Sequence, residues 1–221
     1  MNEQRPIIIV GMARSGTTWL ARLLHAQGIS MWDWDSTHAE DGDIWGWLSA
    51  EMLLNKPDYG MIPFAYIPSK DFLDRLRSYG DRRQEEAPAG WGFKEPRISR
   101  MLKAFLEVWP RGRYILCLRN PLSVVWSQRA RKGASLTEQQ HLRNDTTALA
   151  NVLACFAGRE GDLHVLNYDS DPKVEIAALA EFLKREIRMT GEWKHSMAVR
   201  GYTPEGGECP TYEITRDEDG S

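Results

Sequence analysis

The sequence has few cysteines and no long apolar run. Its three cysteines, Cys117, Cys155 and Cys209, are widely spaced and form neither a C-x-x-C pair nor an even disulfide framework. Reduced thiols in the cytoplasm are the simplest interpretation. No stretch approaches the roughly 20 apolar residues that cross a membrane, and the aliphatic run at 7–10 is too short for the core of a signal peptide. These absences predict a soluble cytoplasmic protein with no membrane span.

An excess of positive charge is also absent. The chain carries 28 Lys and Arg against 31 Asp and Glu, a formal net charge of −3. This balance excludes a generally basic nucleic-acid coat, so we expect no nucleic-acid partner, but it permits a local basic pocket. At 221 residues, one domain over 1–221 is the default prediction, and two tight domains are the alternative. We expect the acidic end, about 205–221, to be a flexible tail. The oligomeric state stays open.

Strand-like and helix-like segments alternate along the chain. Residues 7–10 form an aliphatic run between Pro6 and Gly11, as expected of a strand buried on both faces of a parallel sheet. The alternation predicts an α/β protein: a P-loop-type three-layer fold with a central, mostly parallel sheet of four to five strands flanked by helices. Loops are expected at 29–43 and 81–90. The predicted strands are 7–10, 91–94, 113–118 and 163–168, and the predicted helices are 17–27, 44–55, 70–79 after a Ser69 cap, 97–109, one from 121, one capped by Ser135 and Glu138, and one from 172.

The loop after the first predicted strand has the spacing of an anion-binding loop. It reads GMARSGTT over residues 11–18, with two glycines separated by four residues. Glycines allow successive backbone N–H groups to converge on an anion, and the N-terminus of the next helix adds its positive end. An ATP-binding Walker loop has Lys directly after its second glycine. This chain has Thr17 there, and its loop cation is Arg14. A Gly-rich turn without a ligand is the alternative.

The segment GMARSGTTWL (11–20) resembles the 5′-phosphosulfate loop of the sulfotransferases that use 3′-phosphoadenylyl sulfate (PAPS), which typically reads [K/R]-[S/G]-G-T-T after a buried strand. Arg14 is similar to the loop cation of the tyrosylprotein and several bacterial branches, whereas many cytosolic members have Lys. The resemblance implies PAPS as the donor cosubstrate and no metal. The donor-binding residues that it implies in this loop are Arg14, Ser15, Gly16, Thr17, Thr18 and Trp19.

A second motif follows the predicted strand at 113–118. Arg119 begins the sequence RNP, and Ser127 lies eight residues later in the next predicted helix. A guanidinium can bind phosphate through two parallel hydrogen bonds. The 3′-phosphate motif of the same superfamily has this Arg–Ser spacing, so the resemblance implies that Arg119 and Ser127 bind the 3′-phosphate. The alternative is a surface arginine in a salt bridge.

A third motif ends the predicted strand at 91–94. Lys94 begins the sequence KEP, which resembles the Lys-[DE]-Pro segment whose lysine faces the transferring group in the superfamily. A solvated lysine at a strand end is the alternative. Arg97 either reaches the same anion or caps the sheet edge. With the segment HVLNYDSDPKVEIAALAEFLKRE (164–186), the resemblance covers about residues 6–185.

The implied reaction is in-line transfer of a sulfuryl group from PAPS to a hydroxyl or amine of a small-molecule or peptide acceptor. Arg14 and Lys94 would stabilise charge on the leaving oxygen, and a general base would take the acceptor proton. Glu40 fits that role best by resemblance, narrowly ahead of His38 and Asp41, with Asp33, Asp35 and Asp43 nearby. The alternative for each of these side chains is an ordinary solvated loop residue with no catalytic role.

Two further groups of residues have open roles. Four tryptophans, Trp32, Trp34, Trp45 and Trp47, either line the acceptor pocket or pack in the core. The cluster Arg129, Arg131 and Lys132 either steers an anionic donor or is a solvated face. The competing functions are a Mg-dependent nucleoside-phosphate kinase or other P-loop nucleotide enzyme, and a nucleotide-binding protein without catalysis.

Overall fold

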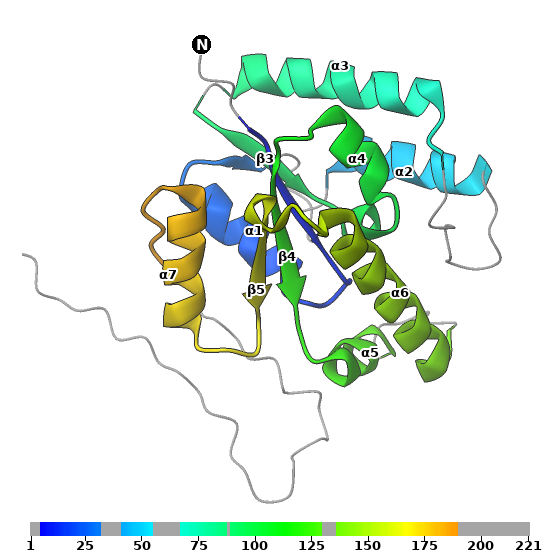
Figure 1. The fold of residues 1–221 in the computed structure, drawn as a ribbon, viewed down its shortest axis with the longest axis vertical. Coiled ribbons are helices and arrows are strands. Elements are labelled where there is room, and N and C mark those ends of the chain that lie inside the picture. The colour runs from blue at the N-terminus through cyan, green and yellow to red at the C-terminus, as the bar shows by residue number, and fades with distance from the viewer. Residues whose placement is uncertain (1–4, 32–40, 55–66, 88, 130–135, 190–221) are drawn as a thin grey trace, which may run out of the picture.

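The computed structural model describes residues 5–31, 41–54, 67–87, 89–129 and 136–189 (Figure 1). Within these ranges, five strands form one sheet in the order β2-β3-β1-β4-β5, and all neighbouring strands run parallel. The predicted α/β architecture with a central parallel sheet is therefore confirmed. The strands are β1 (Ile7–Gly11), β2 (Ser30–Met31), β3 (Trp91–Lys94), β4 (Arg113–Leu118) and β5 (Leu163–Asn167).

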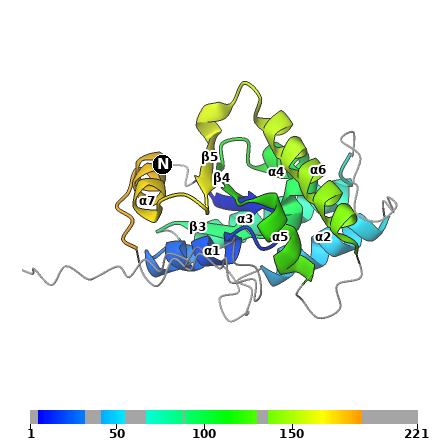
Figure 2. The same cartoon turned by 90° about the horizontal axis from the view of Figure 1, so that it is seen from below.

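Helices cover both faces of the sheet and make it the middle of three layers. Side chains alternate between the faces of a strand, so Ile7 and Ile9 of β1 pack with α1 and α7, whereas Ile8 and Val10 pack in the cluster that contains α2, α3, α4 and α6. Figure 2 shows α1 and α7 on one side of the sheet and α4 and α6 on the other. The helices are α1 (Thr17–Ala26), α2 (Gly42–Leu54), α3 (Lys70–Glu86), α4 (Leu102–Val108), α5 (Pro121–Arg129), α6 (Glu138–Phe156) and α7 (Pro172–Leu183), with short helical turns η2 (Pro96–Arg100) and η3 (Glu160–Asp162).

The helix α3 is longer than the sequence predicts. Its predicted cap is confirmed, because the Ser69 hydroxyl accepts a hydrogen bond from the Phe72 N–H at 3.2 Å. The prediction of a loop from residue 81 is wrong, since α3 continues to Glu86. The side chain of Arg83 explains the extension: it is fully buried and donates to the Ser30 carbonyl at 2.8 Å. This contact lies 53 residues away in the chain and leaves no local signal.

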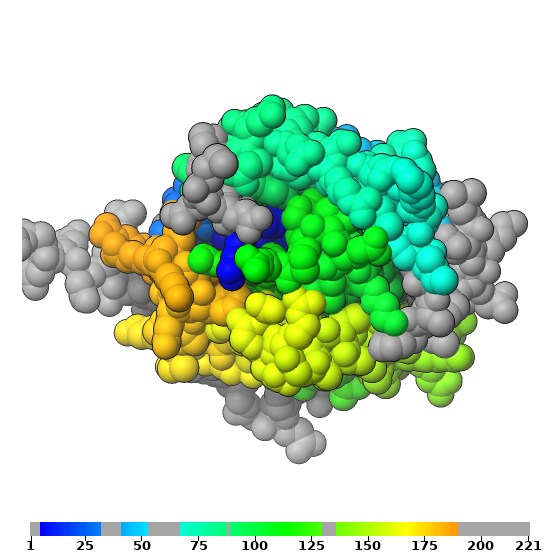
Figure 3. All heavy atoms as spheres, turned by 45° about the horizontal axis from the view of Figure 1, so that its top comes forward, coloured from blue at the N-terminus to red at the C-terminus, as the bar shows by residue number. Residues whose placement is uncertain are grey.

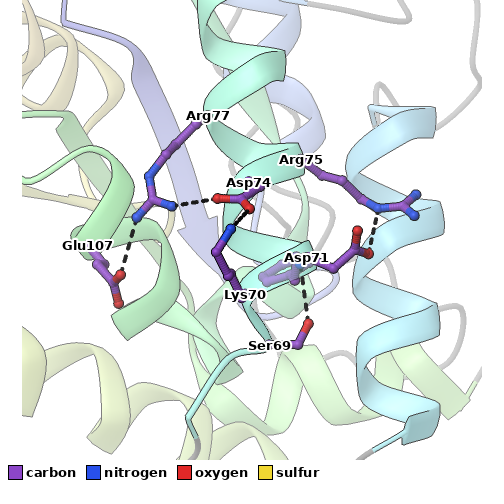
Figure 4. Close-up of polar contacts among 8 residues, drawn as sticks. Ser69, Lys70, Asp71, Asp74, Arg75, Arg77 and Glu107 are labelled. Carbon is purple, nitrogen blue, oxygen red and sulfur yellow. Dashed lines mark hydrogen bonds and ion pairs between the residues drawn. The ribbon is translucent and has the colours of Figure 1, made fainter.

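The outer face of α3 carries ion pairs that do not decide the fold. Arg75 contacts Asp71 at 2.8 Å, and Arg77 lies 3.0 Å from Asp74 and 3.3 Å from Glu107 of α4 (Figure 4). All of these side chains are about half exposed or more, and such pairs contribute about 0.2–1 kcal/mol each. Figure 3 shows α3 and α4 next to each other at the surface of the molecule.

Three other predicted boundaries differ from the structure. The two-residue strand β2 and the first residues of α2 lie inside the predicted loop at 29–43. The sequence did not predict β2, because so short a strand has no detectable hydrophobic pattern. The predicted helix at 97–109 is interrupted at Met101, where the carbonyl of Ser99 accepts from the Asn151 amide at 2.6 Å. The capping box of α6 is made by Thr137 and Gln140, two residues after the predicted position.

The parallel arrangement brings three loops to one edge of the sheet. β1, β3 and β4 are neighbours, with Ile9 paired to Lys94 and Gly11 paired to Cys117. In Figure 1, the arrowheads of β4 and β5 point to the lower edge of the molecule, where α5 begins. Ligands of open α/β sheets bind at the carboxyl ends of the strands, so this edge is where a site is expected.

Candidate functional site

The loop after β1 is shaped by two glycines in conformations that other residues rarely adopt. Gly11 has φ of 142° and Gly16 has φ of 98°. A Cβ atom on Gly16 would lie 2.4 Å from Cδ2 of Tyr168, and one on Gly11 would lie 2.7 Å from the Cys117 carbonyl oxygen. Both positions therefore require glycine, for backbone angle and for space.

The first turn of α1 begins directly after this loop. Its N-cap residue is Gly16, which has no side chain to accept a hydrogen bond from the first-turn amides. A helix N-terminus with the loop amides before it is a site for an anion. The Ser15 hydroxyl donates to the Met12 carbonyl at 2.7 Å, so this side chain stabilises the loop itself. Thr17 is buried in the first turn of α1, where Thr18 is half-buried.

Arg14 and Arg119 meet at the tips of the neighbouring strands β1 and β4. The Arg119 Nη1 donates to the Arg14 carbonyl at 3.2 Å, and the Arg14 Nε donates to the Ser127 hydroxyl at 2.9 Å. The sequence predicts that these three residues serve one site, and the structure brings them together although they come from β1, β4 and α5. Arg14 lies 105 residues before Arg119 and 113 residues before Ser127 in the chain.

Arg119 is a buried arginine, unlike the surface residue of the alternative interpretation. Its side chain is 3% exposed, and its guanidinium lies over the Tyr168 ring, 5.9 Å from the ring centre. An ion pair with Asp169 does exist, at 3.8 Å. Tyr168 also contacts Gly16 and packs edge-on against Trp19, with 6.0 Å between the ring centres. Burial raises the pKa of the Tyr168 phenol, and the charge of Arg119 opposes that rise.

Lys94 ends β3 beside the same loop. It is 1% exposed, which rules out the solvated lysine of the alternative interpretation. Its positive charge acts on the buried Cys117 thiol of β4, where it opposes the rise in pKa that burial causes. A buried ammonium is costly unless it is paired or hydrogen-bonded, so the burial of Lys94 at the end of β3 distinguishes it from an ordinary surface lysine.

Arg97 is committed to a structural contact on the α2 side. Its Nε donates to the Glu95 carboxylate at 2.8 Å, and its Nη1 donates to the Ser49 hydroxyl at 2.7 Å. The guanidinium also lies over the indole of Trp45, 5.1 Å from the ring centre. The sequence left open whether Arg97 binds the anion, and the structure pairs it with Glu95 and joins it to Ser49 of α2.

Most candidates for the general base lie outside the described residues. These candidates are Asp33, Asp35, His38 and Glu40. Two of the four tryptophans considered for the acceptor pocket, Trp32 and Trp34, also lie outside the described residues.

The two acidic candidates that are described make other contacts. Asp41 is buried, caps α2 by accepting from the Ile44 N–H at 3.0 Å and accepts from the Tyr79 hydroxyl at 2.8 Å. Burial raises its pKa. Asp43 pairs with Arg82 at 2.6 Å at the surface. Asp41 is therefore a structural residue of α2.

The remaining open residues divide between core and surface. Trp47 packs edge-on against Tyr79, with 6.0 Å between ring centres, as part of the core cluster. Trp45 is 51% exposed on α2. Arg129 forms an exposed ion pair with Glu138, while Arg131 and Lys132 lie outside the described residues.

Sequence reasoning missed Ser99, which joins η2 to the end of β1. Its hydroxyl accepts from the Gly11 N–H at 2.9 Å and donates to the Gly11 carbonyl at 3.1 Å. It also missed Gln128, whose amide contacts the Ala13 carbonyl. A serine in η2 and a glutamine in a helix have no distinctive pattern, so only the three-dimensional contacts reveal them.

The fold is that of a P-loop-like α/β protein, with basic side chains at the tips of its central strands. A model of the sulfotransferase family matches residues 6–188, so the chain belongs to the sulfotransferase family. A comparison with curated proteins finds no significant match. No helix in the described part of the chain has the length and apolar character needed to cross a membrane.

Solved structures of bacterial sulfotransferases share the fold. The sulfotransferase STF9 from Mycobacterium avium is 14% identical with a TM-score of 0.55; the match covers 85% of this chain and 66% of STF9, which is less than two thirds of its length. The sulfotransferase domain from the curacin biosynthetic pathway is 16% identical, with a TM-score of 0.54 and coverage of 85% and 76%. The sulfotransferase domain of the Synechococcus PCC 7002 olefin synthase is 17% identical, with a TM-score of 0.53 and coverage of 89% and 82%.

Proposed function

We propose that this protein transfers a sulfuryl group from PAPS to a hydroxyl or amine of a small-molecule or peptide acceptor. The observation that carries the proposal is the direct contact between Arg14 and Arg119 at the tips of β1 and β4, with buried Lys94 at the tip of β3. A nucleotide with anionic groups at both its 5′ and 3′ ends matches cations supplied by neighbouring strands.

The donor would lie across these strand tips. Arg14 and the N–H groups of the 11–18 loop would hold the 5′-phosphosulfate, as backbone amides and a helix N-terminus hold phosphates elsewhere. Arg119 and Ser127 would bind the 3′-phosphate. Ser127 contacts Arg14 at 2.9 Å, so the proposed 5′ and 3′ sites adjoin. Tyr168 supports both sides, because it contacts Gly16 and lies under Arg119.

The proposed chemical step is an in-line displacement at sulfur. The acceptor oxygen or nitrogen forms a new bond to sulfur while the bond from sulfur to the bridging oxygen breaks, and adenosine 3′,5′-bisphosphate leaves with the bonding electron pair. The acceptor proton passes to a base, for which we propose Glu40. Lys94 and Arg14 would stabilise the charge that develops on the leaving oxygen. Burial suits Lys94 to this role, since a charge acts more strongly where water is excluded.

Calorimetric titration with adenosine 3′,5′-bisphosphate and with ADP tests the proposed function. We expect the bisphosphate to bind about 10- to 100-fold more tightly, because charged hydrogen bonds to a 3′-phosphate contribute roughly 1.5–3 kcal/mol. Tighter binding of ADP, or Mg²⁺-dependent ATP turnover, would favour a P-loop kinase and end the proposal. A screen of hydroxyl and amine acceptors with labelled PAPS then tests catalysis: a protein that binds the bisphosphate but sulfates no acceptor is a nucleotide-binding protein without catalysis.

A further inference from the structure

The backbone of Arg14 is held in an unfavourable conformation. Its φ is 76°, in the left-handed region that residues with a Cβ atom rarely occupy. Such a conformation persists only where the surrounding structure fixes it. The contacts on either side of Arg14 therefore determine how this part of the loop presents its N–H groups.

Side chains hold both carbonyl groups that flank the Arg14 backbone. The Arg14 carbonyl accepts from Arg119 at 3.2 Å, and the Ala13 carbonyl accepts from Nε2 of Gln128 at 3.2 Å. A peptide unit is planar and trans, so its C=O and N–H point in opposite directions. The contact with Gln128 consequently turns the Arg14 N–H away from α5.

Gln128 is itself fixed by a second hydrogen bond. Its Nε2 also donates to Oδ2 of Asp145 at 3.0 Å, and a glutamine amide has two N–H donors. Both donors are thereby engaged, one on the loop and one on α6. Asp145 is 7% exposed, and the charged group that acts on it from η2 is Arg100.

We infer that Gln128 is a positioning residue for donor binding and that Asp145 acts through it, so that together they hold the 13–14 peptide with the Arg14 N–H directed at the 5′-phosphosulfate. This inference rests on the proposed function for the identity of the ligand. The bridge from α6 through α5 to the loop is a property of the protein alone and can be tested without any ligand.

The burial of Asp145 supports a role beyond holding the fold together. Burial raises the pKa of Asp145 to about 6, although the hydrogen bond from Gln128 and the charge of Arg100 both act to lower it. At neutral pH the folded protein therefore keeps a buried negative charge that works against folding. A neutral side chain would serve a purely structural contact at lower cost.

The test replaces Gln128 with methionine, which has a similar length and no N–H donor. We expect Gln128→Met to bind adenosine 3′,5′-bisphosphate roughly 5- to 30-fold more weakly, in keeping with the loss of one or two hydrogen bonds. Binding of adenosine 3′-monophosphate, which lacks the 5′ group, should stay unchanged. Amide hydrogen exchange over residues 12–18 of the ligand-free full chain should become faster. Gln139→Met, at an exposed position of α6, is the matched control and should change none of these.

A double-mutant cycle tests whether Asp145 acts through Gln128. Asp145→Asn alone should weaken binding of the bisphosphate, and it should add little in the Gln128→Met background, because the second change acts on a bridge already lost. Full additivity would show that Asp145 does not act through Gln128.

Different experimental results would contradict the proposed function and the inference about Gln128. A wild-type protein that binds neither adenine nucleotide contradicts the proposed function. If the wild type binds the bisphosphate but Gln128→Met binds it equally well, the inference is wrong. It is also wrong if Gln128→Met loses affinity for the bisphosphate and for adenosine 3′-monophosphate to the same extent. Unchanged amide exchange over 12–18 in Gln128→Met also overturns it, whichever ligand the protein binds.

Discussion

At the scale of single residues, burial decides what the charged groups at the strand tips can do. Arg119 has a side chain that is 3% exposed and Lys94 is 1% exposed. Charged residues of these types are seldom so buried, and each lies at the carboxyl end of a strand, where Arg119 is also 3.8 Å from Asp169. Arg97 is also partly buried, and its contacts with Glu95 at 2.8 Å and with Ser49 at 2.7 Å hold its guanidinium on the α2 side.

Arg119→Ala should distinguish binding of the donor's 3′-phosphate from binding of its 5′ end. We expect this variant to bind adenosine 3′,5′-bisphosphate about 10- to 100-fold more weakly, since hydrogen bonds to charged groups contribute about 1.5–3 kcal/mol. Adenosine 5′-phosphosulfate, which has no 3′-phosphate, should lose clearly less affinity, because it loses only the support that Arg119 gives to the Arg14 carbonyl. Calorimetry measures both. Arg119→Lys is the control that keeps the charge but loses the paired donors, and an equal loss for both ligands would exclude a 3′-phosphate role.

Lys94→Met should affect the chemical step more than donor binding. Methionine fills a similar buried volume without a charge, so the fold should be retained. We expect kcat to fall by about 10²- to 10³-fold, the usual effect of losing one group that stabilises transition-state charge. Steady-state kinetics with the best acceptor found measures this. A variant with wild-type kcat would remove Lys94 from the proposed mechanism.

At the scale of elements, the loop between β1 and α1 depends on the packing of its second glycine against β5. Gly16 has φ of 98° and lies against the ring of Tyr168, the residue after β5. Gly28, at the end of α1, has φ of 80°, and a Cβ atom there would meet nothing within 4 Å. The two glycines therefore separate backbone strain from steric overlap.

Gly16→Ala should be much more damaging than Gly28→Ala. We expect Gly28→Ala to lower the free energy of unfolding by about 1–2 kcal/mol, the cost of a left-handed conformation for a residue with Cβ. Gly16→Ala adds the overlap with Tyr168, so it should cost roughly 3–4 kcal/mol and abolish bisphosphate binding. Urea unfolding and calorimetry measure the two effects. Equal losses of stability would mean that the Tyr168 contact does not constrain the loop.

The sequence predicts elements well where the signal is local. The aliphatic run of β1 and the start of α7 at Pro172, where the Asp171 side chain accepts from the Lys173 N–H at 2.8 Å, are of this kind. The last turn of α3 and the break at Met101 are not, because they depend on contacts of Arg83 with β2 and of Asn151 with η2. The site follows the same rule: motifs identify Arg14, Arg119 and Ser127, whereas Gln128, Asp145 and Ser99 are recognised only by the partners that the fold brings to them.

At the scale of the whole molecule, the pH dependence of stability includes a contribution from Asp145. Its pKa is about 6 in the folded state against an ordinary 3.8, so between these values the folded state binds more protons than the unfolded state. The contribution of Asp145 to the free energy of unfolding is therefore fully present below about 3.8 and is lost as the pH rises through about 6.

Asp145→Asn should remove that dependence. Relative to wild type, the variant should gain roughly 1–2 kcal/mol in the free energy of unfolding between pH 4 and pH 7, an amount reduced by partial solvent access. Urea unfolding at both pH values measures the gain. Asp81→Asn, at an exposed position of α3, is the control and should follow the wild type. A variant whose difference from wild type is the same at both pH values would contradict the assigned ionisation.

The contact between Arg119 and the Arg14 carbonyl has a thermodynamic consequence. Because this hydrogen bond joins the proposed 5′ and 3′ subsites, an anion that changes the geometry of one subsite would alter the affinity of the other. Linkage requires this influence to be mutual: whatever factor a 3′-phosphate contributes to the binding of a 5′ anion, the 5′ anion returns in equal measure. The two ends of an intact donor would therefore bind cooperatively at Arg14 and Arg119.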